Sequence, residues 1–336
     1  MIPPNAFAPL VHGGDLDAAR KLFPSAPESF VDLSTGINPH PYPIPPLDPQ
    51  VFARLPEPAA LNHLADRAAA AYGAPSGENV VPASGGQILV TLTAGLVPPG
   101  RATILGPTYA EHARAALLAG HQVETVCTLE PLSEADLAIV VNPNNPDGTV
   151  FCAAELFAVA ERLTARDGLL IVDEAFMDVS SGAESLISFV ERGNVVVLRS
   201  FGKFFGLAGL RLSFALASRG LVARLSAALG PWPVSGSALT IGTAALSDQD
   251  WIAETRLSLA MSAQRLDGLL DGAGLERLGG TSLFSLVRVP DAPQLFDRLG
   301  RAGIFVRRFA DEPEWLRFSL PGAEPEWQRL EVALRS

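Results

Sequence analysis

The chain contains little cysteine and histidine, and it carries no excess of positive charge. Its two cysteines, Cys127 and Cys152, have the spacing of neither a metal site nor a redox pair, so we expect free thiols in a reducing compartment. The five histidines are scattered, and no metal site is expected from them. A formal net charge of −11 argues against binding to nucleic acid or to an anionic membrane, because either partner requires a basic face.

Long apolar runs are absent as well. No stretch is long enough to span a bilayer, and the first residues, Met-Ile-Pro-Pro-Asn, lack the charged and apolar regions of a signal peptide. We therefore expect a soluble cytoplasmic protein that acts on a small molecule. An anionic molecule is compatible with the net charge, because a pocket can be locally positive.

The order of the apolar runs predicts an α/β fold. Runs typical of buried strands alternate with helical patterns through the middle of the chain, which predicts a mostly parallel central sheet covered by helices. The expected strands are 102–105, 122–127, 136–141, 169–173, 195–199 and 210–216, and the expected helices include 59–72, 88–96, 109–119 and 153–166.

Both ends of the chain differ from this middle part. The first 50 residues are rich in proline and glycine, which disfavour regular structure, so we expect an arm over 1–50 that packs with the small domain. After a large domain over 51–235, a long helical stretch precedes three further strands. This pattern predicts a smaller α+β domain over 236–336. The expected elements of that domain are a helical stretch over 237–270, strands over 282–289, 304–308 and 315–320, a helix over 292–301, and a final helix from about 325.

A glycine-rich stretch places one lysine between two predicted strands. It reads Ser200-Phe-Gly-Lys203-Phe-Phe-Gly-Leu-Ala-Gly-Leu-Arg211, and it follows the apolar run Val195-Val-Val-Leu198. Glycines allow a ligand to approach the backbone closely, and partial desolvation makes a lysine amine a better nucleophile. The alternative is a plain strand connection whose lysine reaches into solvent.

Two further motifs follow apolar runs upstream of this lysine. Asn142-Pro-Asn-Asn145-Pro-Asp-Gly148 follows one run, and Ile171-Val-Asp173-Glu-Ala-Phe176 ends another. In α/β folds, functional residues gather at the ends of strands. The three motifs, in this order, resemble those of the pyridoxal-phosphate (PLP)-dependent aminotransferase superfamily. The resemblance spans nearly the whole chain and implies PLP as the cofactor and the PLP-dependent transferase fold type I.

The resemblance also implies roles for individual residues. Lys203 would bind PLP covalently and then act as general acid and base, and Asp173 would face the pyridine nitrogen. Asn145 would contact the phenolic oxygen of PLP and Tyr109 would stack on its ring. The phosphate of PLP would be held by Ser84, Gly85, Gly86, Ser200 and Arg211. Each of these residues could instead have a purely structural role: Ser84 could cap a helix, and Asn145 could form a turn.

The chain departs from many relatives at two positions. Phe176 stands where they have a tyrosine that contacts the phenolic oxygen, so Asn145 would make that contact with less help. Arg54-Leu55-Pro56 has leucine where they have a tyrosine that reaches the phosphate in the partner subunit. We expect a homodimer with its sites at the interface, since in such enzymes each site borrows residues from the neighbouring subunit.

Within the superfamily, the chain most resembles the histidinol-phosphate-aminotransferase-like branch, which includes threonine-phosphate decarboxylases. The segments His12-Gly-Gly-Asp15 and Asp32-Leu-Ser-Thr-Gly36-Ile-Asn-Pro39 are similar to theirs, although Gly36 stands where they often have asparagine. Substrates in this branch are phosphorylated amino acids or amino alcohols. Arg317 is then expected to bind a carboxylate. The remaining candidates for substrate anions are His12, Gly36 and one of Arg307 and Arg308, whose side chains should point to opposite faces of a strand.

Three functions remain open on the sequence alone. The first is PLP-dependent decarboxylation of O-phospho-L-threonine to (R)-1-amino-2-propanol phosphate in cobalamin biosynthesis. The second is an aminotransferase for histidinol phosphate or a related amino acid. The third is a non-catalytic small-molecule-binding protein on the same fold, against which the intact set of Lys203, Asp173 and Asn145 argues.

Overall fold

The computed structural model describes residues 10, 12–27, 29–180 and 182–335. Contacts divide these residues into two compact units. The first unit is built mainly from residues 42–145 and 150–252. The second takes in 12–41, the short segment 146–149 and 253–335. The proline-rich segment is thus divided, with residues 12–41 in the second unit and residues 42–50 in the first.

The first unit contains a seven-stranded sheet in the order β2-β8-β7-β6-β5-β3-β4. The five strands β3 to β7 run parallel to one another, whereas β8 is antiparallel to both β7 and β2. The expectation of a mostly parallel central sheet is therefore confirmed. The strands are β2 (Val80–Ala83), β3 (Arg101–Leu105), β4 (Gln122–Val126), β5 (Leu137–Val141), β6 (Leu169–Asp173), β7 (Val195–Ser200) and β8 (Ser213–Ala217).

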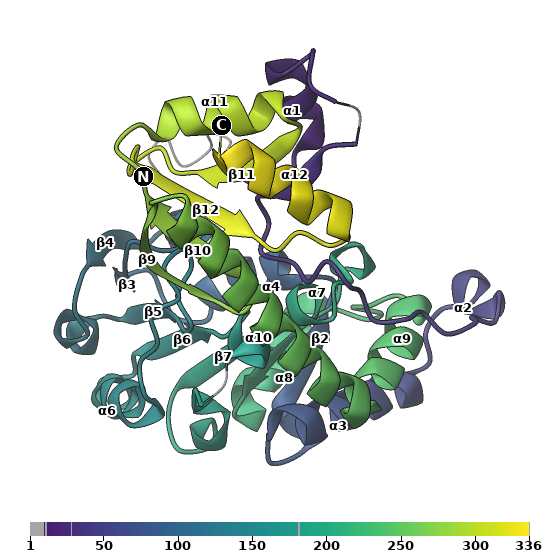
Figure 1. The fold of residues 1–336 in the computed structure, drawn as a ribbon. Helices are drawn as coiled ribbons and strands as arrows, with labels where there is room; N and C mark the ends of the chain where they lie inside the picture. Colours follow the sequence, from purple (N-terminus) through teal and green to yellow (C-terminus); the bar gives the residue numbers. More distant parts are fainter. Residues whose placement is uncertain (1–9, 11, 28, 181, 336) are drawn as a thin grey trace. The chain divides into compact units, whose positions relative to one another are not determined.

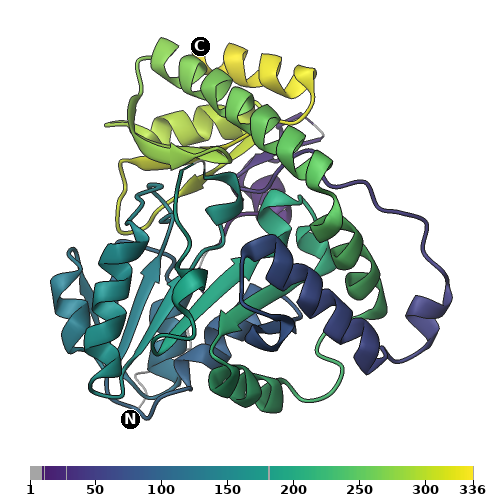
Figure 2. The same ribbon diagram turned by 90° about the horizontal axis from the view of Figure 1, so that it is seen from below.

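Helices cover both faces of this sheet (Figure 2). Alternate residues of the central strands, such as Ile139, Ile171 and Val196, pack in one core with α4 (Gly86–Ala94), α5 (Glu111–Leu118) and α8 (Arg219–Leu229). On the other face, α6 packs on β6 and α3 on β2. Because strands buried on both faces can be apolar throughout, β5 and most of β6 read as continuous apolar runs.

The remaining helices of this unit follow from local sequence signals. α3 (Pro58–Tyr72) begins with proline in its first turn and ends at Gly73, whose φ of 80° suits glycine, as the sequence predicted. The other α-helices described in this unit are α2 (Gln50–Ala53), α6 (Ala153–Thr164), α7 (Phe201–Phe204), α9 (Gly236–Ser247) and the start of α10 (Gln249–Gly272).

The second unit contains a five-stranded sheet in the order β1-β11-β12-β10-β9. Its helices α11 and α12 pack against each other, and α11 packs on β11 (Figure 1). The sequence did not predict β1, which lies in the proline-rich segment and pairs in parallel with β11. The elements are α1 (Leu16–Leu22), β1 (Val31–Leu33), β9 (Glu276–Thr281), β10 (Phe284–Arg288), α11 (Ala292–Arg301), β11 (Ile304–Arg308), β12 (Trp315–Ser319) and α12 (Glu324–Arg335).

A buried ion cluster joins β7 to the loop after β6 in the first unit. Arg199 Nη1 donates to Asp178 Oδ1 at 2.8 Å, and its Nε lies 3.1 Å from Glu174 Oε2. Glu174 also accepts from the Ser185 hydroxyl at 2.6 Å and from the Leu186 amide at 2.9 Å. All three charged side chains are buried. Glu174 directly follows Asp173, and Arg199 directly precedes Ser200, so the cluster anchors the backbone beside two predicted site residues.

Candidate active site

Adjacent parallel strands bring three predicted residues to one edge of the seven-stranded sheet. Val141 at the end of β5 lies opposite Asp173, and Asp173 lies opposite Leu198 near the end of β7. Asn145 and Lys203 come shortly after β5 and β7. Parallel strands place their carboxyl ends at the same edge, so the three motifs found along the sequence are brought together there.

Asp173 is held by two hydrogen bonds inside the first unit. Its Oδ1 accepts from the backbone amide of Ala175 at 3.0 Å, and its Oδ2 lies 2.9 Å from Nε2 of His112. Asp173 is 8% exposed and His112 is 1% exposed. The carboxylate is therefore fixed in direction before any ligand binds.

His112, the partner of Asp173, is not among the predicted site residues. It lies in the first turn of α5, three residues after Tyr109, and its backbone amide donates to the Tyr109 carbonyl at 3.1 Å. The two rings meet edge to face, with centroids 5.9 Å apart. That spacing of three residues at a helix start was the available signal, because residues three apart share a helix face.

Lys203 lies in the single turn of α7, half-buried among aromatic rings. Its Nζ is 5.5 Å from the centroid of the Phe176 ring, a cation–π contact. Phe204 and Phe205, which follow it, are buried and pack against Trp251. The phenylalanine that replaces the expected tyrosine therefore contacts the lysine amine.

Ser84, Gly85 and Gly86 form the entrance to α4, as predicted. Gly85 has a φ of 92°, and a Cβ there would collide with the guanidinium of Arg211. Arg211 itself adopts a left-handed conformation and donates from Nη1 to the Ala208 carbonyl at 3.1 Å. A helix N-terminus beside an exposed arginine favours a phosphate-type anion. The Ser84 hydroxyl donates to the Pro233 carbonyl at 2.6 Å, which orients it within this loop.

The loops that carry Asn145 and Tyr109 are tied together. Asn144 Oδ1 accepts from the Thr108 hydroxyl at 2.7 Å, and its Nδ2 donates to the Pro107 carbonyl at 3.0 Å. Tyr109 follows Thr108 directly, and Asn145 follows Asn144. Both predicted ligands of the PLP ring thus extend from one hydrogen-bonded pair of loops.

In the second unit, strand pairing places two arginines on one face of the five-stranded sheet. Arg307 of β11 lies opposite Arg317 of β12, so their side chains share a face. Arg308 points to the other face, where its guanidinium lies 3.9 Å from the ring centroid of Phe296 in α11. Arg307, and not Arg308, therefore shares the sheet face of Arg317.

Arg317 is a buried cation, 5% exposed. Its Nη2 donates to the Ser34 carbonyl at 3.0 Å, and its guanidinium lies 4.8 Å from the ring centroid of Phe284. Burial, and then repulsion by Arg307, lower the pKa of Arg317 to about 9, while the charge of Asp32 opposes this shift. Two neighbouring guanidinium groups in a partly buried position favour binding of an anion.

The loop that begins at His12 packs on the same strands of the second unit. The amide of Gly14 donates to the Ser34 hydroxyl at 2.8 Å, and that hydroxyl donates to Asp32 Oδ1 at 2.5 Å. The amide of Gly36, which has a φ of 68°, donates to the Ser319 hydroxyl at 2.6 Å. His12 is exposed at the start of this loop.

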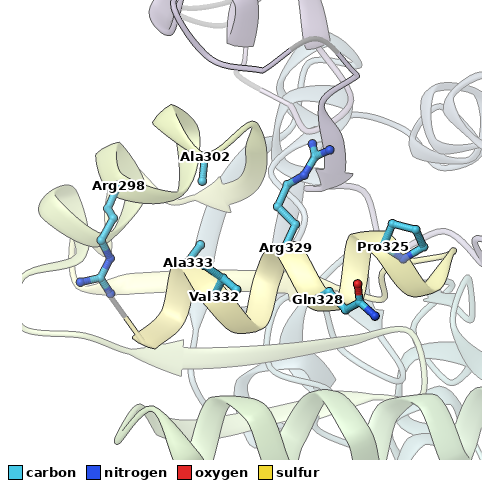
Figure 3. A pocket seen from close by; sticks show the side chains of 7 residues that line it. All are labelled: Arg298, Ala302, Pro325, Gln328, Arg329, Val332 and Ala333. Atoms are coloured by element: carbon cyan, nitrogen blue, oxygen red, sulfur yellow. The ribbon is translucent and has the colours of Figure 1, made fainter.

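A separate apolar cavity of about 400 Å³ lies between α11 and α12 (Figure 3). Its arginines are Arg298 and Arg329, and Arg329 donates to the Ser29 carbonyl at 2.9 Å. None of the predicted site residues lines it. An apolar cavity suits a substrate with two anionic groups poorly, so we do not assign the substrate to it.

Other kinds of site find no support in the part of the chain that the structure describes. Within it, no group of histidine, cysteine and acidic residues could hold a metal ion. Cys127 and Cys152 are both free and exposed. No described helix is long and apolar enough to cross a membrane.

A model of the family "Aminotransferase class I and II" matches residues 31–335. The chain belongs to this family.

Curated relatives and solved structures are similar over nearly the whole chain. A threonine-phosphate decarboxylase from a Sinorhizobium species is 43% identical over 97% of this chain and 98% of the relative. Another, from Pseudomonas aeruginosa, is 42% identical over 97% of each chain. The crystal structure of histidinol-phosphate aminotransferase from Sinorhizobium meliloti in complex with pyridoxal-5'-phosphate has a TM-score of 0.82 at 24% identity. It covers 99% of this chain and 96% of its own.

Proposed function

We propose that the protein uses PLP to decarboxylate O-phospho-L-threonine to (R)-1-amino-2-propanol phosphate, a step of cobalamin biosynthesis. The paired arginines Arg307 and Arg317 carry this proposal, because they offer two cationic groups to a substrate with a carboxylate and a phosphate. Near full-length likeness to two threonine-phosphate decarboxylases supports the same substrate. An aminotransferase for histidinol phosphate or a related amino acid is the competing function within the family.

Several residues of the first unit suit different parts of the PLP molecule. The loop of Ser84, Gly85 and Gly86 with Arg211 suits its phosphate, and Gly85 leaves space that a side chain would fill. Asp173 supplies a fixed carboxylate for the pyridine nitrogen. Tyr109 offers a ring for stacking, and Asn145 an amide for the phenolic oxygen. Ser200, at the start of α7, is the remaining predicted phosphate ligand.

Bound PLP would accept the electron pair released when a bond at the substrate Cα breaks. The protein's own residues choose that bond and handle the protons. Asp173 would keep the pyridine nitrogen protonated, with His112 holding the carboxylate in place. Lys203 would release the cofactor to the substrate amine and then deliver a proton to Cα, replacing the lost carboxylate. The outcome balances as loss of CO₂ and gain of one proton at Cα.

The paired arginines would orient the substrate. Arg317 would bind one anionic group of the substrate through its planar guanidinium, and Arg307 with His12 would bind the other. Two anchored anions would fix the orientation of the substrate and so decide which bond at its Cα breaks.

One experiment separates the candidate functions. The purified protein is supplied with PLP and O-phospho-L-threonine, without any 2-oxoacid, and CO₂ and the amine product are measured. We expect release of CO₂ in equal amount to 1-amino-2-propanol phosphate, and no release with the Lys203→Ala variant. Turnover that depends on 2-oxoglutarate and yields glutamate, or preference for histidinol phosphate, would support the aminotransferase instead. Absence of any pyridoxyl group after borohydride reduction would support a non-catalytic binding protein.

We also propose a cytoplasmic homodimer. Large apolar side chains in the first unit are exposed, and such surfaces often mark subunit contacts: Ile44, Phe52, Leu55 and Trp232. Sedimentation at several concentrations tests this proposal. Full activity in a monomer would contradict it.

A further inference from the structure

One buried carboxylate of the first unit, Glu111, has no role in the proposed mechanism. Glu111, in the first turn of α5, is 7% exposed. Its Oε2 accepts from Gln87 Nε2 at 3.0 Å, and its Oε1 lies 3.6 Å from Nη1 of Arg114. A carboxylate this deeply buried strongly favours a donor, so it fixes the direction of the Gln87 amide.

The other end of that amide faces Tyr109. Because Nε2 of Gln87 is directed at Glu111, its Oε1 is left as an acceptor, and the Tyr109 hydroxyl donates to it at 3.3 Å. Gln87 is also the second residue of α4, directly after Gly86. One side chain therefore links the phosphate loop, a buried carboxylate and the tyrosine hydroxyl.

The ring of Tyr109 is consequently held at two places. Its hydroxyl is tied to Gln87, and the ring meets His112 edge to face, with planes at 84°. His112 is in turn bonded to Asp173. A ring restrained in this way loses less conformational entropy when a flat ligand stacks on it.

We propose that Gln87 is a positioning residue that, oriented by Glu111, fixes the ring of Tyr109 for stacking on PLP. This inference rests on the proposed function, since it assumes that PLP is the stacked ligand. Glutamine suits the position because it can donate to a carboxylate and accept from a phenol at once. A glutamate there would face Glu111 with a like charge, and a methionine would make neither hydrogen bond.

The test is a double-mutant cycle on the dissociation constant of PLP, with visible circular dichroism of the bound cofactor as a second readout. We expect Gln87→Met to weaken PLP binding about three- to tenfold and to change the dichroism, as Tyr109→Phe should. If Gln87 acts through the Tyr109 hydroxyl, adding Gln87→Met to Tyr109→Phe should have little further effect. Gln122→Met, the same change at an exposed glutamine of β4, is the matched control and should leave both readouts unchanged.

A charge exchange gives a second, independent arm. Gln87→Glu alone should weaken PLP binding at least as much as Gln87→Met. The double variant Gln87→Glu with Glu111→Gln restores one donor and one acceptor between the two positions, so binding should recover toward wild type. Recovery would not be expected of a merely structural role for either residue.

Failure of this inference differs from failure of the proposed function. If wild-type protein binds no PLP, the proposed function has failed. If wild type binds PLP but the effects of Gln87→Met and Tyr109→Phe simply add, Gln87 does not act through Tyr109 and the inference is wrong. An unchanged dissociation constant in Gln87→Met would overturn it equally.

Discussion

His112 and Asp173 form a hydrogen-bonded pair within the first unit, with Nε2 2.9 Å from Oδ2. Replacing the histidine removes a partner from a carboxylate that is only 8% exposed. Loss of one partner of a buried charged group costs about 1–3 kcal/mol. We expect His112→Phe to lower kcat/KM by roughly ten- to a hundredfold while the protein stays folded. Steady-state kinetics with PLP in excess, beside the melting temperature, would check this expectation. Unchanged kinetics would show that Asp173 does not depend on His112.

Lys203 is expected to carry the cofactor. Borohydride reduction followed by peptide mass spectrometry should place the pyridoxyl group on Lys203, the residue of α7 whose amine lies over the Phe176 ring. In Lys203→Ala the label should disappear and turnover should fall at least about a thousandfold, because the covalent step and the proton transfer are both lost. A label on Lys21 instead would contradict the assignment.

The two neighbouring arginines of β11 provide a matched comparison. Arg307 shares the sheet face of Arg317, whereas Arg308 stacks on Phe296 on the opposite face. Arg317→Ala and Arg307→Ala should each cost about 2–4 kcal/mol in kcat/KM, since each leaves a substrate anion unpaired. Arg308→Ala should change kcat/KM by less than about threefold. Equal losses at positions 307 and 308 would refute the assignment of faces.

The lowered pKa of Arg317 predicts an alkaline limit for substrate binding. The guanidinium is charged below about pH 9 and becomes neutral as the pH rises through that value. Affinity for the anionic substrate should therefore be full at neutral pH and fall above about pH 9. Repulsion by Arg307 contributes to the shift, so Arg307→Met should raise the pKa of Arg317 and move this limit upward. The KM measured from pH 7 to 10 in both proteins would test the direction.

The sequence predicted the first unit well because its signals are local. Apolar β-branched runs identify the buried parallel strands, and the residues after them, such as Asn145 and Asp173, converge by the geometry of any parallel sheet. The sequence could also predict that Arg307 and Arg308, as consecutive residues of a strand, point to opposite faces of the sheet. The sequence could not predict which of the two arginines shares a face with Arg317, because register depends on pairing between strands that are distant along the chain.

Other features depend on tertiary context alone. β1 lies beside prolines and is short, so local propensity gave no sign that it would pair with β11. His112 looked like one of several scattered histidines: its spacing from Tyr109 places both residues at one helix start, but only the fold brings its ring to Asp173. The contact between Gly85 and Arg211 likewise joins segments more than a hundred residues apart.

The buried cluster of Glu174, Arg199 and Asp178 should control stability in a pH-dependent way. Arg199 contacts both of these buried carboxylates, and its guanidinium also lies 4.8 Å from the ring centroid of Tyr72. Removing it takes a neighbouring positive charge away from both carboxylates. We expect Arg199→Met to lower the free energy of unfolding by about 3–5 kcal/mol at neutral pH.

The direction of the pH effect follows from Glu174. Burial raises the pKa of Glu174, and the charge of Arg199 opposes that rise. Between the ordinary pKa of a glutamate and this raised value, the folded state binds more protons than the unfolded state. Stability therefore falls as the pH rises through that interval.

In Arg199→Met the opposing charge is gone, so the pKa of Glu174 rises further and the fall in stability extends to higher pH. The loss relative to wild type should then be smaller at pH 5 than at pH 8. Urea unfolding of both proteins across this range measures the difference, and Glu174→Gln in the Arg199→Met background should flatten it. A loss independent of pH would show that Arg199 stabilises the fold through packing and not through the charge of Glu174.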